Sequence, residues 1–357
     1  MRSPADGSVA RGSRLRAFIT GLAGTSLSEA EAGFLAEARP CGIIIFSRNF
    51  QDDVQLRALI GASLAAIGAR DLLVLVDQEG GRVQRLRGGG WPNVPPAARF
   101  GDLYRRDRNA ALDVTRTAMH GLGLRLRAVG INTNCAPCLD VPVAAADDVI
   151  GNRAFDDAPD VVAALGRAAA EGLLAAGVVP VIKHVPGHGR ALVDSHKALP
   201  EVRASRADLA ARDFVPFRAL SGMPAAMTAH ITFEAIDSKR PASVSPVVIG
   251  DVIRDEIGFG GLLMSDDISM GALSGQVGDR VRAVLAAGSD VALHCNGDLA
   301  EMQEVAARAP VLAGAALARY ERCLEIVAGE GAALPAAAFD GARALVEGDG
   351  GAGAGNV

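Results

Sequence analysis

Residues 178–182 read V-V-P-V-I, and they lead directly into K-H-V-P-G-H-G-R-A-L-V-D-S-H at residues 183–196. A continuous apolar run of this length predicts a strand that is buried on both faces, as in a parallel sheet. The segment after it holds three of the six histidines of the chain, together with glycines that favour a turn. A polar loop that follows a buried strand and carries many titratable groups predicts a functional site.

The same pattern, an apolar run followed by a helical segment, repeats along the chain. The apolar runs lie at 17–20, 42–46, 72–76, 131–136, 178–182, 225–229, 261–264 and 290–293. Helical patterns lie at 28–38, 53–67, 107–128, 158–176, 207–220, 245–256 and 279–287, and residues 300–328 are expected to supply a closing helix. Eight alternations predict an α/β fold, a single-domain (β/α)8 TIM barrel. A doubly wound open sheet is the alternative, but no G-x-G-x-x-G motif follows the first run, which disfavours dinucleotide binding.

The expected barrel domain spans residues 14–330. Residues 1–13 are expected to be disordered, and residues 331–357 are expected to form a C-terminal extension with a disordered Gly/Ala-rich end. Near the start of the barrel, Ser28 and Glu31 have the spacing of a capping box, which predicts that a helix begins there.

Composition excludes several classes of function. The 357 residues carry a net charge of −5, so no basic face for nucleic acid is expected. Apolar runs are too short to cross a membrane, and no apolar segment follows the basic N-terminus as in a secretory signal, so neither a membrane span nor a secretory signal is expected. Five cysteines do not indicate a disulfide framework. The C-x-x-C at 135–138 allows redox chemistry or half a zinc site, but buried reduced thiols at a strand end are favoured. No cofactor, metal or obligate protein partner is expected.

A barrel places functional side chains at the C-terminal ends of its strands. Polar residues follow nearly every apolar run: 47–49, 77–82, Asp140, Lys183 with His184, His230, 265–267 and Asn296. Their convergence on one face predicts a polar pocket.

Individual residues leave alternatives open. Asp266 at a buried strand end is costly unless paired or used, so a functional role is favoured over a helix cap. Asp267 should point away from it and be structural. Lys183 is either a Schiff-base lysine or a donor to a substrate hydroxyl. A metal pair of His184 and His188 would need helical spacing, which the prolines and glycines of that loop disfavour.

The roles of four further charged residues are left open by the sequence. Asp77 and Glu79 are candidates for ligands or acids. Arg85 and Arg153 are either functional or surface charges, although the apolar neighbours of Arg153 favour an inward orientation.

Four strings resemble one known family. They are V-D-Q-E-G-G-R-V-Q-R at 76–85, K-H-V-P-G-H-G at 183–189, D-S-H-K at 194–197 and S-D-D-I-S-M at 265–270. Together they resemble glycoside hydrolase family 3, most closely its single-domain bacterial β-N-acetylglucosaminidases. The resemblance runs in order from about residue 17 to about residue 296. Val185 stands where the family commonly has Phe, which is an apolar exchange.

The resemblance implies a retaining exo-glycosidase that removes terminal β-linked GlcNAc through a covalent glycosyl-enzyme. It implies that Asp266 is the nucleophile, that His196 is the general acid/base and that Asp194 is the partner of His196. It implies that the sugar is bound by Asp77, Arg85, Arg153, Lys183 and His184. The usual substrates of this family are muropeptides with GlcNAc linked to anhydro-N-acetylmuramic acid, which are processed in cytoplasmic cell-wall recycling.

A histidine is suited to proton transfer here because its ordinary pKa, roughly 6.5, lies near neutral pH. Asp194 would orient the ring and stabilise the imidazolium, and the glycines of the loop suggest that His196 moves into place on substrate binding. The alternatives are phosphorolysis, a broader β-glycosidase activity, attack by the 2-acetamido group of the substrate, a Schiff-base aldolase using Lys183, and a sugar-binding protein without catalysis.

Overall fold

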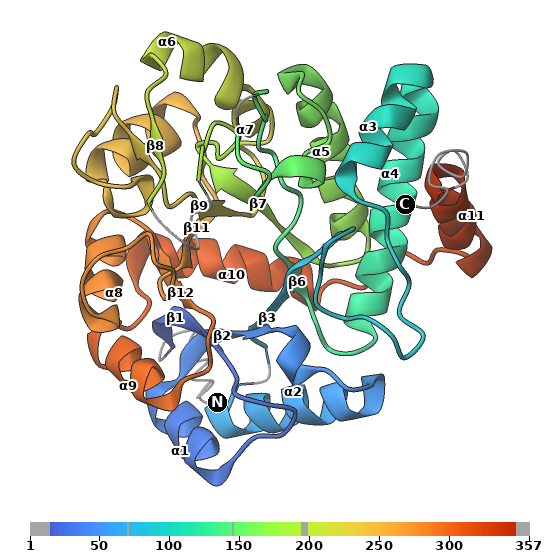
Figure 1. The fold of residues 1–357 in the computed structure, drawn as a ribbon. Helices are drawn as coiled ribbons and strands as arrows, with labels where there is room; N and C mark the ends of the chain where they lie inside the picture. The colour runs from blue at the N-terminus through green and yellow to red at the C-terminus, as the bar shows by residue number, and fades with distance from the viewer. Residues whose placement is uncertain (1–14, 70, 145, 194–198, 348–357) are drawn as a thin grey trace, which may run out of the picture.

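Eight parallel strands close into a barrel in the computed structural model, which describes residues 15–69, 71–144, 146–193 and 199–347. The strands are β1 (Arg16–Gly21), β2 (Pro40–Ile45), β3 (Leu73–Val76), β6 (Thr133–Asn134), β7 (Val179–Val185), β9 (Ala225–Thr228), β11 (Leu262–Asp267) and β12 (Val291–His294). Each pairs with the next in this order, and β12 pairs with β1 (Figure 1). All eight predicted strands are present, which confirms the TIM barrel and excludes the open sheet.

The apolar runs are continuous because the strands are covered on both faces. Every residue of β2 and of β7 is buried, and in β3 the four residues Leu73–Val76 are at most 1% exposed. Their side chains point alternately into the barrel and toward the surrounding helices, so apolar residues are favoured at every position.

Helices surround the barrel in Figure 1. They are α1 (Glu29–Ala38), α2 (Asp53–Ile67), α3 (Ala97–Arg106), α4 (Arg108–Arg127), α5 (Pro159–Ala175), α6 (Arg206–Asp208), α7 (Val215–Ala219), α8 (Val277–Ala286), α9 (Leu299–Arg308), α10 (Gly314–Ala328) and α11 (Ala336–Glu347), with π-helical segments at Leu209–Asp213 and Val248–Glu256. The capping box at α1 is confirmed, since Ser28 Oγ accepts from the N–H of Glu31 at 3.2 Å and the Glu31 carboxylate accepts from the N–H of Ser28 at 3.1 Å. None of the helices in the described ranges is long and apolar enough to cross a membrane.

The expected single helix over 300–328 is wrong, because two helices form there. Ala309 has extended backbone angles and Pro310 has no N–H to donate, so α9 ends at Arg308. The linking residues instead bond to the first strand, with the N–H of Ala17 donating to Pro310 O at 2.8 Å.

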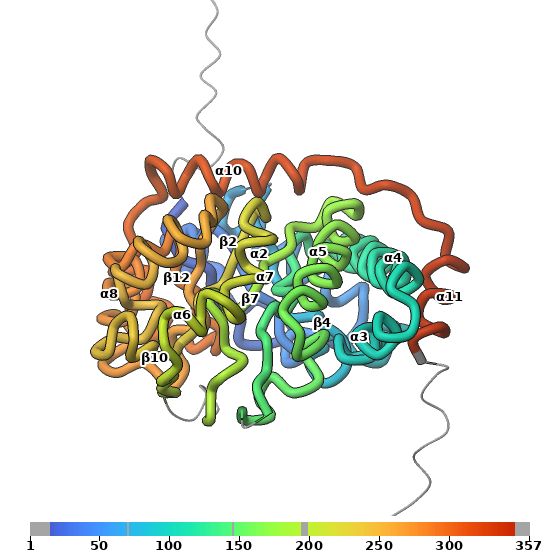
Figure 2. The backbone as a smooth tube through the Cα atoms, turned by 90° about the horizontal axis from the view of Figure 1, so that it is seen from above, coloured from blue at the N-terminus to red at the C-terminus, as the bar shows by residue number. Residues whose placement is uncertain are grey.

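Helix α10 runs across one end of the barrel in Figure 2. The hydroxyl of Tyr320 donates to Cys41 O at 2.7 Å, near the start of β2. Helix α10 therefore covers the N-terminal ends of the strands, and the loops lie at the C-terminal ends.

Part of the predicted C-terminal extension is helical. Helix α11 packs against α4, where Phe339 lies so close to Gly121 that a Cβ at that position would be 2.3 Å from its ring. The sequence pattern did not predict this helix, and the domain boundary near residue 330 stays a prediction.

Candidate active site

A cavity of about 490 Å³ opens at the C-terminal ends of the strands. The structure brings together six of the eight predicted site residues in its lining: Asp77, Arg85, Arg153, Lys183, His184 and Asp266. The remaining two, Asp194 and His196, lie outside the described residues, and their roles stay predictions.

Lys183 lies at the centre of a charged network on one side of the cavity. Its Nζ is 2.7 Å from Asp77 Oδ1 and 2.7 Å from Glu79 Oε1. Arg85 Nη2 lies 3.2 Å from the other oxygen of Asp77. Arg153 donates to both oxygens of Glu79, at 2.7 and 2.9 Å. Two carboxylates and three cations thus hold each other in fixed orientations.

The network keeps its members charged. Burial by itself raises the pKa of Asp77 and Glu79 because it disfavours the ionised form. Lys183 and Arg85 outweigh burial at Asp77 and hold its pKa well below the usual range, while Arg153 and Lys183 lower the pKa of Glu79 to about 2. Both carboxylates are therefore ionised at neutral pH.

The ammonium of Lys183 is stabilised by the same contacts. Burial lowers the pKa of Lys183, but Asp77 and Glu79 outweigh it and hold the pKa above its ordinary value. A Schiff-base lysine needs a lowered pKa and a free amine. Of the two interpretations of Lys183, its surroundings favour the hydrogen-bond donor.

A hairpin directly after β3 positions the acidic part of the network. It consists of β4 (Gln78–Gly80) and β5 (Val83–Gln84). Gln78 Oε1 accepts from the N–H of Arg85 at 2.8 Å, and the backbone of Gln78 exchanges two hydrogen bonds with the side chain of Asn134 at 2.9 and 3.0 Å. Buried amides therefore fix the hairpin to the end of β6.

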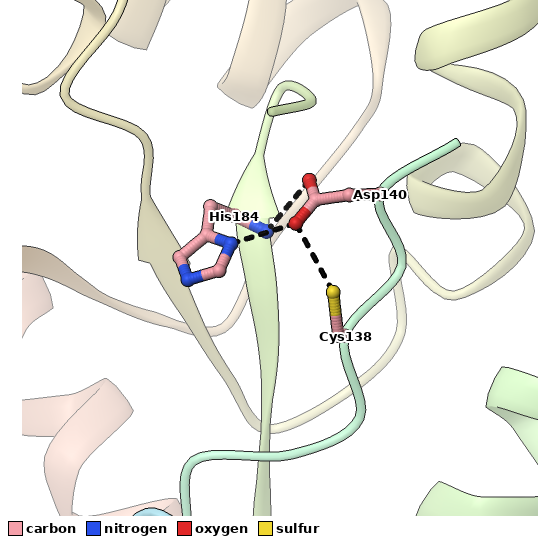
Figure 3. Close-up of side chains that lie close together, drawn as sticks. All are labelled: Cys138, Asp140 and His184. Carbon is pink, nitrogen blue, oxygen red and sulfur yellow. Dashed lines mark hydrogen bonds and ion pairs between the residues drawn. The ribbon is translucent and has the colours of Figure 1, made fainter. Parts of the chain in front are cut away.

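His184 is held from behind by a buried carboxylate. Its Nδ1 lies 2.7 Å from Asp140 Oδ2, which also accepts from Cys138 Sγ at 3.1 Å (Figure 3). The sequence pattern places Asp140 just past a strand but assigns it no role. Its partner is 44 positions away along the chain, and proximity in sequence could not reveal the pair.

Asp266 has fewer partners than the other carboxylates around the cavity. Its Oδ1 accepts from the N–H of Asp267 at 2.8 Å, and no further hydrogen bond to it is formed by the described part of the chain. Burial raises the pKa of Asp266, but His184 and His230 outweigh burial, so the pKa lies below its ordinary value. The site thus presents an ionised carboxylate with an unoccupied oxygen.

Asp267 is satisfied by its own loop, as expected of a structural residue. Its oxygens accept from the N–H and hydroxyl of Ser269, at 3.0 and 2.5 Å, and from the N–H of Cys295 at 3.1 Å. The Asp267 carbonyl lies 3.0 Å from His230 Nε2, so this nitrogen carries the proton and Nδ1 accepts from Ser243 Oγ at 2.7 Å. These contacts fix the backbone on which Asp266 sits.

Not every polar residue after a strand belongs to the cavity. The amide of Asn49 donates to the carbonyls of Leu22 and Gly24, and Asn296 donates to Glu301. Both hold loops rather than line the cavity. The thiols of Cys135 and Cys138 are buried and free, as expected.

A polar cavity with fixed donors and acceptors at the C-terminal end of a barrel recognises hydroxyl groups, and a free carboxylate within it suits glycoside chemistry. The site thus defines a barrel enzyme of the glycosidase class.

The comparisons with known proteins identify the family. A model described as the glycosyl hydrolase family 3 N-terminal domain matches residues 14–318. A β-hexosaminidase of Alkalilimnicola ehrlichii is 42% identical over 282 residues, covering 78% of this chain and 80% of the relative. One of Thiobacillus denitrificans is 39% identical over 279 residues, covering 77% of each. The structure of NagZ from Neisseria gonorrhoeae in complex with N-trifluoroacetyl-D-glucosamine is 32% identical, with a TM-score of 0.82, and the match covers 94% of this chain and 98% of that one. This chain belongs to glycosyl hydrolase family 3.

Proposed function

We propose that this glycoside hydrolase of the β-hexosaminidase type is a retaining exo-β-N-acetylglucosaminidase that forms a covalent intermediate on Asp266. The family and the β-hexosaminidase relatives support the reaction class. The observation that carries the assignment of the nucleophile is the hydrogen bonding of Asp266, a residue that lines the cavity and whose Oδ2 has no hydrogen-bond partner among the described residues. A nucleophile needs such a lone pair.

The proposed reaction has two steps. Asp266 attacks the anomeric carbon while His196 protonates the leaving oxygen, so the glycosidic bond breaks and an ester to Asp266 forms. His196 then takes a proton from water, which attacks the same carbon and releases both the sugar and the carboxylate. Asp194 orients the His196 ring in both steps.

The charged network is proposed to bind the hydroxyls of the sugar. Lys183, Arg85 and Arg153 donate hydrogen bonds, and Asp77 accepts them. Each carboxylate oxygen has more than one lone pair, so Asp77 can accept from hydroxyls while it keeps its contacts to the cations. The ion pairs hold these groups in place before the sugar arrives, which reduces the entropy lost on binding.

The physiological substrate proposed is a muropeptide with GlcNAc β-linked to anhydro-N-acetylmuramic acid, and the role proposed is cell-wall recycling. Both rest on the resemblance to single-domain bacterial members of the family. The cytoplasmic location stays a prediction.

Turnover of a chromogenic β-GlcNAc glycoside beside the matching β-glucoside and β-xyloside tests the reaction class, each with and without phosphate. We expect the GlcNAc glycoside to be preferred and the product to be the free sugar in the β-anomeric form, as observed by NMR at early times. An α-anomeric first product would contradict retention. Formation of a sugar 1-phosphate would show that the reaction is phosphorolysis and not hydrolysis.

A further inference from the structure

Behind the cavity, the carboxylate of Asp140 accepts hydrogen bonds from four donors and is completely buried. We propose that Asp140 is a positioning residue: it fixes His184 as the Nδ1–H tautomer and so presents the lone pair of Nε2 to a sugar hydroxyl. The inference rests on the proposed function for the identity of the hydroxyl, but the tautomer of His184 can be measured without it.

The hydrogen bonds of Asp140 determine where the proton of His184 lies. Oδ2 is 2.7 Å from His184 Nδ1 and 3.1 Å from Cys138 Sγ, whereas Oδ1 accepts from the backbone N–H groups of His184 at 3.2 Å and His188 at 2.6 Å. Burial raises the pKa of Asp140, but the two histidines outweigh it and hold the pKa well below the usual range. An ionised carboxylate can only accept, so Nδ1 of His184 must carry the proton.

The other ring nitrogen then becomes an acceptor on the cavity side. Figure 3 shows the second nitrogen of His184 pointing away from Asp140 and Cys138, and His184 lines the cavity. Within the described ranges, Nε2 of His184 has no hydrogen-bond partner. A neutral imidazole with Nδ1–H has its lone pair at Nε2, which would accept a hydroxyl proton, whereas the neighbouring Lys183 can only donate. His184 would thus accept the proton of a sugar hydroxyl, and Lys183 would donate to a hydroxyl oxygen.

The same carboxylate fixes the backbone that carries the ring. The backbone N–H of His188 donates to Asp140, and the His188 ring packs edge-to-face against the His184 ring, with centroids 5.6 Å apart. Gly189 lies so close to the segment after Asp140 that a Cβ would meet Val141 O at 2.0 Å, which requires glycine. Asp140 therefore joins the segments after β6 and β7 and leaves the His184 ring little freedom to rotate.

A metal ion is the alternative occupant of this cluster. Cys138, Asp140 and His184 each offer a ligand atom, and these atoms lie within 4.8 Å of one another. A metal would require the thiolate of Cys138 and an unprotonated Nδ1. Burial and Asp140 hold the pKa of the Cys138 thiol well above its ordinary value, and the distances of 2.7 and 3.1 Å fit protons shared between the groups. The cluster is therefore assigned as a hydrogen-bonded support.

The direct test is the tautomer of His184 in the full-length wild-type enzyme at pH 8, by ¹⁵N-detected imidazole NMR. The His184 signals are assigned by their loss in His184→Gln. We expect a proton on Nδ1 alone. A proton on Nε2, alone or together with Nδ1, would overturn the proposal. This experiment needs neither a folded Asp140 variant nor a substrate.

Asp140→Asn tests the consequence. Two backbone N–H groups point at the position of Oδ1, so the amide oxygen of Asn should occupy that position and its NH₂ should face His184. His184 would then accept at Nδ1 and carry its proton on Nε2, as in a triad whose aspartate becomes an amide. We expect kcat/KM for a β-GlcNAc glycoside to fall at least about 100-fold with the NMR signal switched to Nε2–H.

Cys138→Ala is the matched control, since it removes a donor to Asp140 and leaves the bond between Asp140 and His184 Nδ1 in place. We expect kcat/KM within about threefold of the wild type and an unchanged tautomer. Stoichiometric zinc in the purified wild type that is lost in Cys138→Ala would overturn the proposal in favour of a metal site. If the wild type fails to release GlcNAc but shows Nδ1–H, the proposed substrate is wrong and the positioning role of Asp140 stands.

Discussion

Two adjacent aspartates at the end of β11 differ in how their oxygens are used. Asp267 accepts from Ser269 and Cys295 with both oxygens, whereas Asp266 accepts a single N–H from the described residues. Both side chains line the cavity. The Asp267 carboxylate is hydrogen-bonded at both oxygens and holds the loop, whereas one oxygen of Asp266 has no partner among the described residues. A carboxylate with hydrogen bonds at both oxygens acts as a support, whereas one with an unbonded oxygen can attack, so the bonding of the two oxygens separates the two roles within one sequence motif.

The largest expected effect comes from exchanging Asp266 for Asn. An amide is a poor nucleophile, so we expect kcat for an unactivated GlcNAc glycoside to fall by at least about 10⁴-fold. Asp267→Asn is the matched variant, since it should lower the melting temperature while costing activity far less. Steady-state kinetics and circular dichroism of both proteins check the comparison, and equal losses of activity would remove the distinction.

The next effect is expected at Asp77. Asp77→Ala removes a hydroxyl acceptor and leaves the buried ammonium of Lys183 with Glu79 as its carboxylate partner among the described residues. We expect KM to rise and kcat to fall together, with kcat/KM reduced roughly 10²–10³-fold. Asp113→Ala, which removes an exposed partner of Arg116, is the control. An unchanged kcat/KM would exclude Asp77 from the site.

Glu79 should affect stability in a pH-dependent manner. Its pKa falls from 4.5 to about 2 on folding, so the ionised form stabilises the fold above the unfolded value, and this contribution is lost as the pH falls through the folded value. We expect Glu79→Gln to cost roughly 2–4 kcal/mol at pH 7, and the difference from wild type to shrink below about pH 4.5.

Denaturant unfolding at pH 7, 5, 4 and 3 measures this difference. Glu171→Gln, at an exposed pair with Arg116, should cost less than about 1 kcal/mol at each pH. A cost at Glu79 that stays constant from pH 7 to pH 3 would show that the ion pairs with Lys183 and Arg153 do not produce it.

The smallest effect is expected at Ser269. Ser269→Ala removes one hydroxyl from Asp267, which keeps its two backbone donors. We expect a loss of about 1 kcal/mol of stability and little change in kcat. A large loss of activity with unchanged stability would show that Asp267 acts in the chemistry and not as a support.

The barrel could be predicted because its strands are covered on both faces, which gives continuous apolar runs such as 72–76. Helix α11 could not, because its position depends on the contact between Phe339 and Gly121, far apart in the chain. Pro310 in the sequence indicates a break in the helical segment between 300 and 328. Only the hydrogen bond from Ala17 shows that the linker pairs with a strand.

The site also contains residues that the sequence predicts and residues that only the structure reveals. Strand-end position and family strings were enough to select Asp77, Lys183 and Asp266. They could not show that Glu79 completes the network through Arg153, 74 positions away, or that Asp140 lies behind His184. Those roles depend on pairs that form only when the barrel closes.

The proposed mechanism depends on a covalent intermediate at Asp266. Incubation with a 2-fluoro sugar that traps glycosyl-enzymes, followed by peptide mass mapping, tests it most directly. We expect a single label on the peptide that contains Asp266, located on Asp266 by fragmentation and absent from Asp266→Asn. A label on Asp267 or any other residue, or continued turnover without a trapped ester, would contradict it.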